Sequence, residues 1–132
     1  MIFVDSSVWI DYFNGTDTPA TARLDRALGT EPVAIGDLVL VEVLQGFRDE
    51  GSFTSALAAF EELTTFEILG TQRAIVAARR FRQLKRAGFT IRKTADMLIG
   101  SFCLDEQIPL LYSDRDFDPM VDHLGLMSAL TV

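Results

Sequence analysis

The chain has 132 residues, 48% hydrophobic and 23% charged, which predicts one globular domain over residues 1–132 and excludes intrinsic disorder. Its 19 acidic residues outnumber 12 basic ones, and the net charge of −7 argues against nucleic-acid binding through overall charge. No apolar run approaches the roughly 18 residues that a membrane span needs, and the first residues show no signal-peptide pattern, so we expect a cytoplasmic protein without membrane contact.

The spacing of apolar residues predicts short strands that alternate with helices. The expected strands lie at residues 2–4, 33–35, 66–69 and 110–112, with an edge strand around 126–130. The expected helices lie at residues 6–13, 20–28, 38–45, 52–63, 71–88, 94–106 and 118–123, with caps at Thr18, Asp37 and Thr71. Strands alternating with helices indicate the α/β class, with a central parallel sheet of about four to five strands and helices on both faces.

Two of the expected strands end in acidic residues. Asp5 directly follows the strand at 2–4, at the edge where open α/β sheets bind ligands. Asp5 could equally be the N-cap of the next helix, followed by Ser6 and Ser7. The strand at 110–112 is followed by an acidic turn, which by itself is also typical of solvated loops. That turn reads Ser113-Asp114-Arg115-Asp116-Phe117-Asp118.

Two expected helices each carry an acidic residue among apolar ones. Glu42 is the only ionisable residue of the helix at 38–45, so we expect it in a buried helix or on a narrow exposed strip. Asp96 lies in the first turn of the helix at 94–106, where the helix dipole favours an anion, and Gly100 leaves room for close packing one turn later. A buried carboxylate is unfavourable without a cation or donor beside it, so both are candidate site residues.

Taken together, these acidic residues predict a metal centre. Four or five carboxylates at one sheet edge repel one another and raise one another's pKa unless a cation neutralises them. Cys103 and His123 are the only cysteine and histidine of the sequence, and oxygen ligands favour Mg²⁺ or Mn²⁺ over Zn²⁺. Such ions polarise phosphate groups and lower the pKa of water, so the expected chemistry is phosphoryl transfer.

Four motifs resemble a known family in order and spacing. They are Ile2-Phe3-Val4-Asp5-Ser6-Ser7, the glutamate of an apolar helix, Arg92-Lys93-Thr94-Ala95-Asp96-Met97-Leu98-Ile99, and Tyr112-Ser113-Asp114-Arg115-Asp116-Phe117. Over nearly its whole length the chain resembles a PIN domain, and more narrowly a VapC-type ribonuclease toxin of a toxin–antitoxin pair. The resemblance implies a PIN-like α/β/α sandwich and Mg²⁺- or Mn²⁺-dependent endonucleolytic RNA cleavage that inhibits translation. It also implies a homodimer and a cognate VapB-type antitoxin.

Position by position, the resemblance implies roles for the acidic residues of these motifs and for one serine. The metal-binding acids would be Asp5, Glu42, Asp96, Asp114 and Asp116. The Ser6 hydroxyl matches the family's Ser or Thr that helps to place water beside the metal. Whether Asp114 or Asp116 binds directly, and whether one or two metals are bound, stays open.

Basic residues are concentrated between positions 73 and 93, where no acidic residue occurs. Helical spacing places Arg79, Arg82 and Arg86 on a face apart from the apolar side chains. Such a face is commonly only solvated, but it also suits contacts with RNA phosphates. We therefore expect these three residues, together with Arg92 and Lys93, to contact RNA.

The helix at 6–13 carries three aromatic residues within about two turns. Trp9 and Phe13 share a face because they are four residues apart, and Tyr12 adjoins them. We expect an exposed aromatic surface there, which is typical of a protein-binding groove. The resemblance to VapC toxins implies that its occupant is an antitoxin segment, which would point a basic side chain into the acidic pocket. The alternative is that Trp9 lies wholly in the core or in a homodimer contact.

Other functions stay open on the sequence alone. A phosphatase of the haloacid-dehalogenase type also uses Mg²⁺ and strand-end acids, but it requires a second Asp where Ser7 stands. A receiver-like binding domain requires a lysine near the last strands, and no lysine follows Lys93. The complete set of acids argues against a catalytically idle PIN-like domain. We expect Cys103 to be buried and His123 to lie on the surface.

Overall fold

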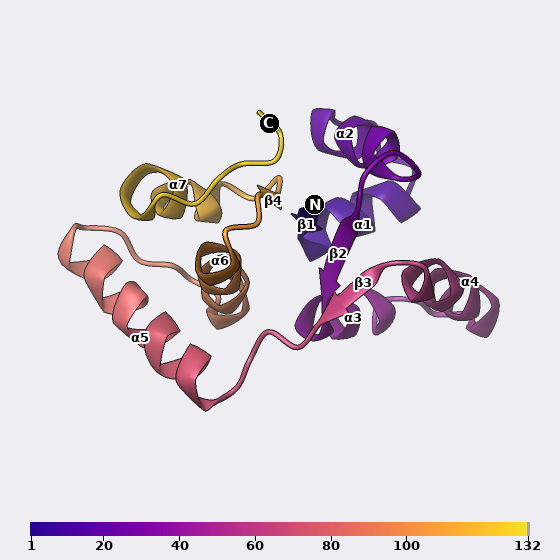
Figure 1. Ribbon diagram of the computed structural model, residues 1–132. Coiled ribbons are helices and arrows are strands. Elements are labelled where there is room, and N and C mark those ends of the chain that lie inside the picture. The colour runs from indigo at the N-terminus through magenta and orange to yellow at the C-terminus, as the bar shows by residue number, and fades with distance from the viewer. Residues whose placement is uncertain (132) are drawn as a thin grey trace.

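A four-stranded parallel sheet forms the centre of the computed structural model, which describes residues 1–131 (Figure 1). The strands are β1 (Ile2–Val4), β2 (Val33–Gly36), β3 (Thr64–Phe66) and β4 (Leu110–Leu111). Their order is β3-β2-β1-β4, and each neighbouring pair is parallel. The chain thus builds outward from β1 to β3 and then returns to the other side of β1. This order confirms the α/β class with a parallel sheet.

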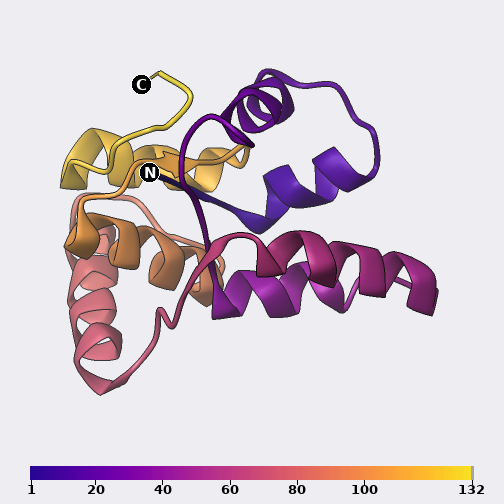
Figure 2. The ribbon, with the colours of Figure 1, turned by 45° about the vertical axis from the view of Figure 1, so that its right-hand side comes forward.

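Helices cover the sheet on both sides. They are α1 (Ser6–Phe13), α2 (Pro19–Ala27), α3 (Asp37–Leu44), α4 (Glu50–Glu61), α5 (Thr71–Arg86), α6 (Thr94–Glu106) and α7 (Asp118–Leu124), the last preceded by the short 3₁₀ helix η1 (Arg115–Phe117). The first four lie to one side and the last three to the other (Figures 1 and 2). Between residues 1 and 131, no helix has the length and hydrophobicity that crossing a lipid bilayer requires.

The register of β1 and β4 brings their carboxyl ends to the same point of the sheet edge. Val4 is paired with Leu111, and the Asp5 N–H then donates to the Leu111 carbonyl at 2.9 Å. The residues after β4 therefore begin beside Asp5. All five residues of these two strands are buried, so the sheet edge is a fixed base for the acidic segments attached to it.

Several elements begin or end where the sequence did not indicate. The strand expected at 66–69 lies at Thr64–Phe66, and the edge strand expected around 126–130 is reduced to a single parallel bridge between Leu110 and Ser128. Asp37 and Thr71 lie inside their helices rather than at the N-cap. Asp37 instead accepts backbone N–H bonds from Leu38 (2.8 Å) and Ile68 (3.2 Å), which ties the start of α3 to the segment after β3.

The expectation of an exposed aromatic face on α1 is wrong for Trp9. Its side chain is only 2% exposed, because α4 covers this part of α1. The Trp9 ring meets Phe60 of α4 edge to face at 5.1 Å and stacks on Phe13 at 5.9 Å. Tyr12 and Phe13 are half-buried against the same core. Trp9 is therefore a core residue, as the alternative had it.

Helix α3 is not buried on all sides, contrary to expectation. Val39 and Val43 are buried, but Val41 is 57% exposed. The helix packs on α1 and α4 along one face only, which leaves its other face to solvent. Glu42 is consequently half-buried, on the border between the two faces.

Candidate metal centre at the sheet edge

The order of the strands brings acidic residues together at the carboxyl ends of β1 and β4. β1 and β4 are neighbours in the sheet. After β1 the chain adds β2 and β3 on one side of it, and it then adds β4 on the other side. In open α/β sheets, ligands bind beyond the carboxyl ends of strands at such a change of order. Asp5 and Asp114 follow the two strands at this edge, and α6 brings Asp96 to them.

Asp5 uses its two carboxylate oxygens differently. Oδ2 accepts hydrogen bonds from the Ser7 hydroxyl (2.6 Å) and the Ser7 N–H (3.3 Å), so Asp5 is the N-cap of α1. Oδ1 is buried and has no hydrogen-bond partner among the described residues. Burial raises the pKa of Asp5, the Ser7 bonds oppose this, and the Asp114 charge adds to the rise. The cap and the site, which the sequence left as alternatives, are thus compatible in one side chain.

Asp96 is buried in the first turn of α6, among other carboxylates. Its side chain is 5% exposed, and Oδ2 has no partner among the described residues. Burial, together with the nearby Asp5 charge, raises the pKa of Asp96 to about 7. Asp114 and Glu42 act in the same direction, while Lys93 partly offsets them. An additional cation beside such a carboxyl group would stabilise its charged form and lower its pKa.

Glu42 reaches the same electrostatic environment from α3. Its Oε1 atom is buried and has no partner in the part of the chain that the structure describes. Burial raises the pKa of Glu42, and the Asp5 charge raises it further. The Ser6 hydroxyl and the Lys93 ammonium act in the opposite direction, so Ser6 faces Glu42. The role expected of Ser6, placing water, stays a prediction.

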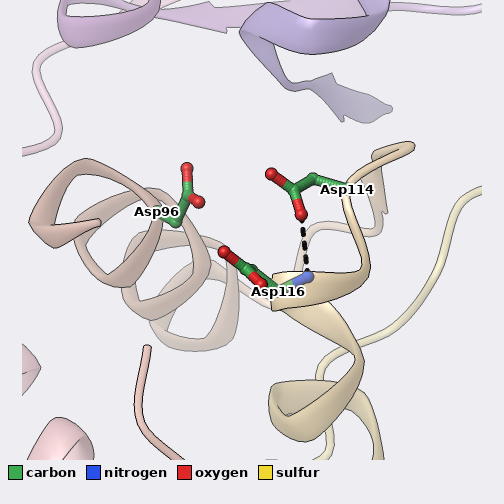
Figure 3. A group of neighbouring side chains, drawn as sticks. All are labelled: Asp96, Asp114 and Asp116. Atoms are coloured by element: carbon green, nitrogen blue, oxygen red, sulfur yellow. Dashed lines mark hydrogen bonds between the residues drawn. The ribbon is translucent and has the colours of Figure 1, made fainter. Parts of the chain in front are cut away.

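Asp96, Asp114 and Asp116 lie close enough to share a cation. One carboxylate oxygen from each residue lies within 4.8 Å of the other two, and the three side chains turn toward a common space (Figure 3). Asp114 Oδ1 also accepts the Asp116 N–H at 2.9 Å, which fixes the start of η1. Asp5 and Glu42 lie outside this trio, but both act electrostatically on Asp96.

The residues present fit a divalent metal. Three buried carboxylate oxygens, from Asp5, Glu42 and Asp96, have no donor among residues 1–131. Unpaired buried anions are costly, and a bound cation would offset the charge that these three side chains place around Asp96. The donors are oxygens only, which suits a hard ion such as Mg²⁺ or Mn²⁺.

Sequence reasoning missed three contacts of this site. The Ser7 hydroxyl, rather than that of Ser6, holds Asp5, and the Asp5-Ser6-Ser7 capping pattern was the available signal. Arg92 forms two hydrogen bonds with Asp116, and Lys93 lies 3.9 Å from Asp114. These pairs join segments more than 20 residues apart, so no local pattern reveals them.

The other basic residues expected to contact RNA lie on α5. Arg79, Arg82 and Arg86 are exposed, and none of the three forms an ion pair within residues 1–131. Arg73 and Arg80, on the same helix, instead pair with Asp105 and Glu106 of the α6 end. The expected RNA-facing stripe is therefore free of internal partners in the described chain, and its contact with RNA stays a prediction.

Known proteins resemble this chain along its whole length. The PIN domain family model matches residues 2–121. A VapC ribonuclease of Mycobacterium bovis and Ribonuclease VapC11 of Mycobacterium tuberculosis are each 28% identical to it over 131 residues, covering 98% of both chains.

Solved structures share the fold at lower identity. VapBC2 from Rickettsia felis, bound to a promoter DNA fragment, has a TM-score of 0.75 at 18% identity, covering 97% of each chain. VapC20 of Mycobacterium tuberculosis, described as a toxin that cleaves the sarcin–ricin loop, has a TM-score of 0.61 at 19% identity, covering 89% of this chain and 93% of that one. Since the family match runs from β1 into α7 and takes in all five acidic residues of the site, this chain belongs to the PIN domain family.

Proposed function

We propose that this protein is a divalent-metal-dependent endoribonuclease that acts as the toxin of a VapBC-type toxin–antitoxin pair and inhibits translation by cleaving RNA. The observation that carries the proposal is the set of three buried carboxylate oxygens without partners at the carboxyl edge of the sheet, within the described chain. Relatives named as VapC ribonucleases support the same activity.

In the proposed reaction, the acidic residues and the two serines of the site have different roles. Asp5, Glu42, Asp96 and Asp114 would hold Mg²⁺ or Mn²⁺, and an ion held there would supply Lewis-acid polarisation of the RNA phosphate. Ser7 fixes the Asp5 carboxylate through its 2.6 Å hydrogen bond. Ser6, beside Glu42, orients the attacking water.

The experiment that tests this activity incubates the purified protein with total cellular RNA and maps the new ends. Mg²⁺ and Mn²⁺ should support cleavage, whereas EDTA should abolish it. Ca²⁺ should inhibit, because its longer and looser coordination misplaces the reacting groups. Cleavage that persists after thorough chelation, or equally in the Asp96→Asn variant, would contradict the proposal.

The proposed partner is a VapB-type antitoxin, as the Rickettsia felis and Klebsiella pneumoniae toxin–antitoxin complexes suggest. Its candidate contact is a small groove between α1 and α3 of about 160 Å³, lined by Ile10, Phe13, Val43 and Phe47 among others. Ile10 is 42% exposed, so it is a better surface probe than Trp9. Ile10→Ser should weaken binding of the co-expressed antitoxin while leaving the fold intact, and unchanged affinity would place the antitoxin elsewhere.

The protein is also proposed to form a homodimer, in keeping with its resemblance to VapC toxins. Light scattering after size-exclusion chromatography measures this directly. A mass near twice 14.7 kDa for the toxin alone is the expected result.

A further inference from the structure

Arg92 grips Asp116 with two hydrogen bonds at the rim of the metal centre. Its Nε donates to Asp116 Oδ2 at 3.2 Å, and its Nη2 donates to Asp116 Oδ1 at 3.1 Å. Both carboxylate oxygens are therefore engaged by one guanidinium. Such two-point pairs fix orientation as well as charge, and Arg keeps its charge at every relevant pH.

Asp114 is held differently, although it lies two residues away. Its Oδ1 accepts a single backbone N–H, from Asp116, and its Oδ2 lies 3.9 Å from the Lys93 ammonium. This Lys93 contact is longer than a hydrogen bond, so it adds charge near Asp114 without fixing the orientation of that carboxylate. Asp114 thus has an oxygen that accepts no hydrogen bond among the described residues, whereas both oxygens of Asp116 already accept one from Arg92.

The net charge of the site also favours a metal at Asp114 rather than at Asp116. Five carboxylates (Asp5, Glu42, Asp96, Asp114 and Asp116) are accompanied by two cationic side chains, Arg92 and Lys93. One divalent ion brings this group to a net charge of −1, whereas two ions bring it to +1 with a guanidinium already on Asp116. A second ion near Asp116 would therefore meet like charge at close range.

We propose that Arg92 takes the place of a second metal ion, so that Asp116 is its counterion and the centre binds a single divalent cation through the acids around Asp96. The inference rests on the proposed function, because it assumes that the centre holds a metal. Arg92 acts here as a positioning residue through Asp116. Its side chain is 75% exposed, so its remaining N–H donors face solvent, where the RNA substrate would lie.

The test is a titration of the metal-free protein with Mn²⁺, followed by calorimetry and by the electron paramagnetic resonance signal of free Mn²⁺. The wild-type protein should bind one ion per chain. Arg92→Gln should bind two, because both oxygens of Asp116 become available. Arg92→Gln combined with Asp116→Asn should return to one ion, and Arg92→Lys, which keeps a charge, should also bind one.

Arg115→Gln is the matched control. Arg115 lies in the same loop between Asp114 and Asp116, is exposed, and forms no ion pair within the described residues. Its loss should leave the count at one ion, and an Arg115→Gln variant that also bound two ions would overturn the specific role of Arg92.

Two ions on the wild-type protein, or one on Arg92→Gln, would likewise overturn the inference while leaving the proposed metal-dependent nuclease activity intact. A folded wild-type protein that bound none would contradict the proposed function as well.

Discussion

The carboxylate of Asp5 combines a structural role with a proposed catalytic one. One oxygen caps α1, and caps of this type stabilise a protein by about 1 kcal/mol. The other oxygen is buried and has no partner among residues 1–131, and the Asp114 charge acts on the same carboxylate. Asparagine caps helices about as well as aspartate does, so Asp5→Asn removes the charge and largely preserves the cap.

Neutralising Asp5 or Asp96 should separate activity from stability. Asp5→Asn and Asp96→Asn should each lower RNA cleavage by at least roughly 100-fold, because each removes a metal-binding charge. In EDTA, the same changes relieve repulsion among buried acids, and the melting temperature should rise by about 3–5 °C for each kcal/mol recovered. Calorimetry and a cleavage assay measure the two effects.

Asp17→Asn is the control for these substitutions, because Asp17 is exposed and lies outside the site motifs. It should change neither cleavage nor melting temperature. Full cleavage by either site variant at saturating Mg²⁺ would exclude that residue from the metal centre.

The raised pKa of Asp96 predicts a pH dependence of the metal-free protein. The folded-state pKa is about 7, whereas the ordinary value is 3.8. Between those values, the folded protein holds a proton that the unfolded chain has lost, so stability from this group falls as pH rises from about 4 to about 7 and is then constant. The melting temperature of Asp96→Asn in EDTA should exceed that of the wild type by an amount that grows from pH 5 to about pH 7 and then stays constant up to pH 8. A constant difference would show that Asp96 ionises normally.

At the scale of elements, α6 positions Asp96 through close packing on α7. A Cβ atom added at Gly100 would collide with the sulfur of Met120, which is itself fully buried. We expect Gly100→Ala to destabilise the protein by about 1–3 kcal/mol in urea denaturation, despite the higher helix propensity of alanine. Gly51→Ala in α4 is the control, because the nearest atom there belongs to the exposed Asp49 side chain. That change should be neutral or stabilise by up to about 1 kcal/mol.

Local sequence signals predicted correctly those helices whose ends are marked by residues next to them in the sequence. The predicted bounds of α1 and α6 are correct at both ends, because polar caps or turns flank apolar runs of helical spacing. The strand predicted at 66–69 was displaced, because pairing with β2 selects Thr64–Phe66 and leaves Ile68 to the Asp37 carboxylate. Trp9 was misplaced for a similar reason, since only the tertiary position of α4 decides that it is buried.

The acidic residues of the site were predictable as isolated anomalies. Asp5 and Asp96 stand out in the sequence because their neighbours are apolar, and both prove to be buried. The partners of those acids were not predictable, since Arg92 meets Asp116 only through the packing of α6 beside η1. The sequence thus identifies the acidic side chains that need a cation or a hydrogen-bond donor, but only the folded structure identifies Arg92 as the partner of Asp116.

At the scale of the whole molecule, an acidic protein is proposed to bind an acidic polymer. The net charge of −7 opposes this, but charges act over only about 8 Å at physiological salt, so local pattern decides. Arg79, Arg82 and Arg86 form an exposed basic stripe on α5, which packs on α6. Nearby acids of α6 are already paired with Arg73 and Arg80, so they do not cancel this stripe.

Replacing Arg79, Arg82 and Arg86 together by Gln should therefore weaken RNA binding and flatten its salt dependence. Each lost phosphate contact lowers the slope of log affinity against log salt by roughly 0.7 for single strands, so three contacts lower it by about 2. Fluorescence anisotropy with the Asp96→Asn variant as background keeps the RNA intact. Arg26 of α2 and Arg48, between α3 and α4, are exposed, and these helices lie on the other side of the molecule from α5 (Figure 1). Arg26→Gln with Arg48→Gln should therefore leave the slope unchanged. An unaltered slope in the triple variant would mean that the α5 stripe is only solvated and that RNA follows another path to the metal centre.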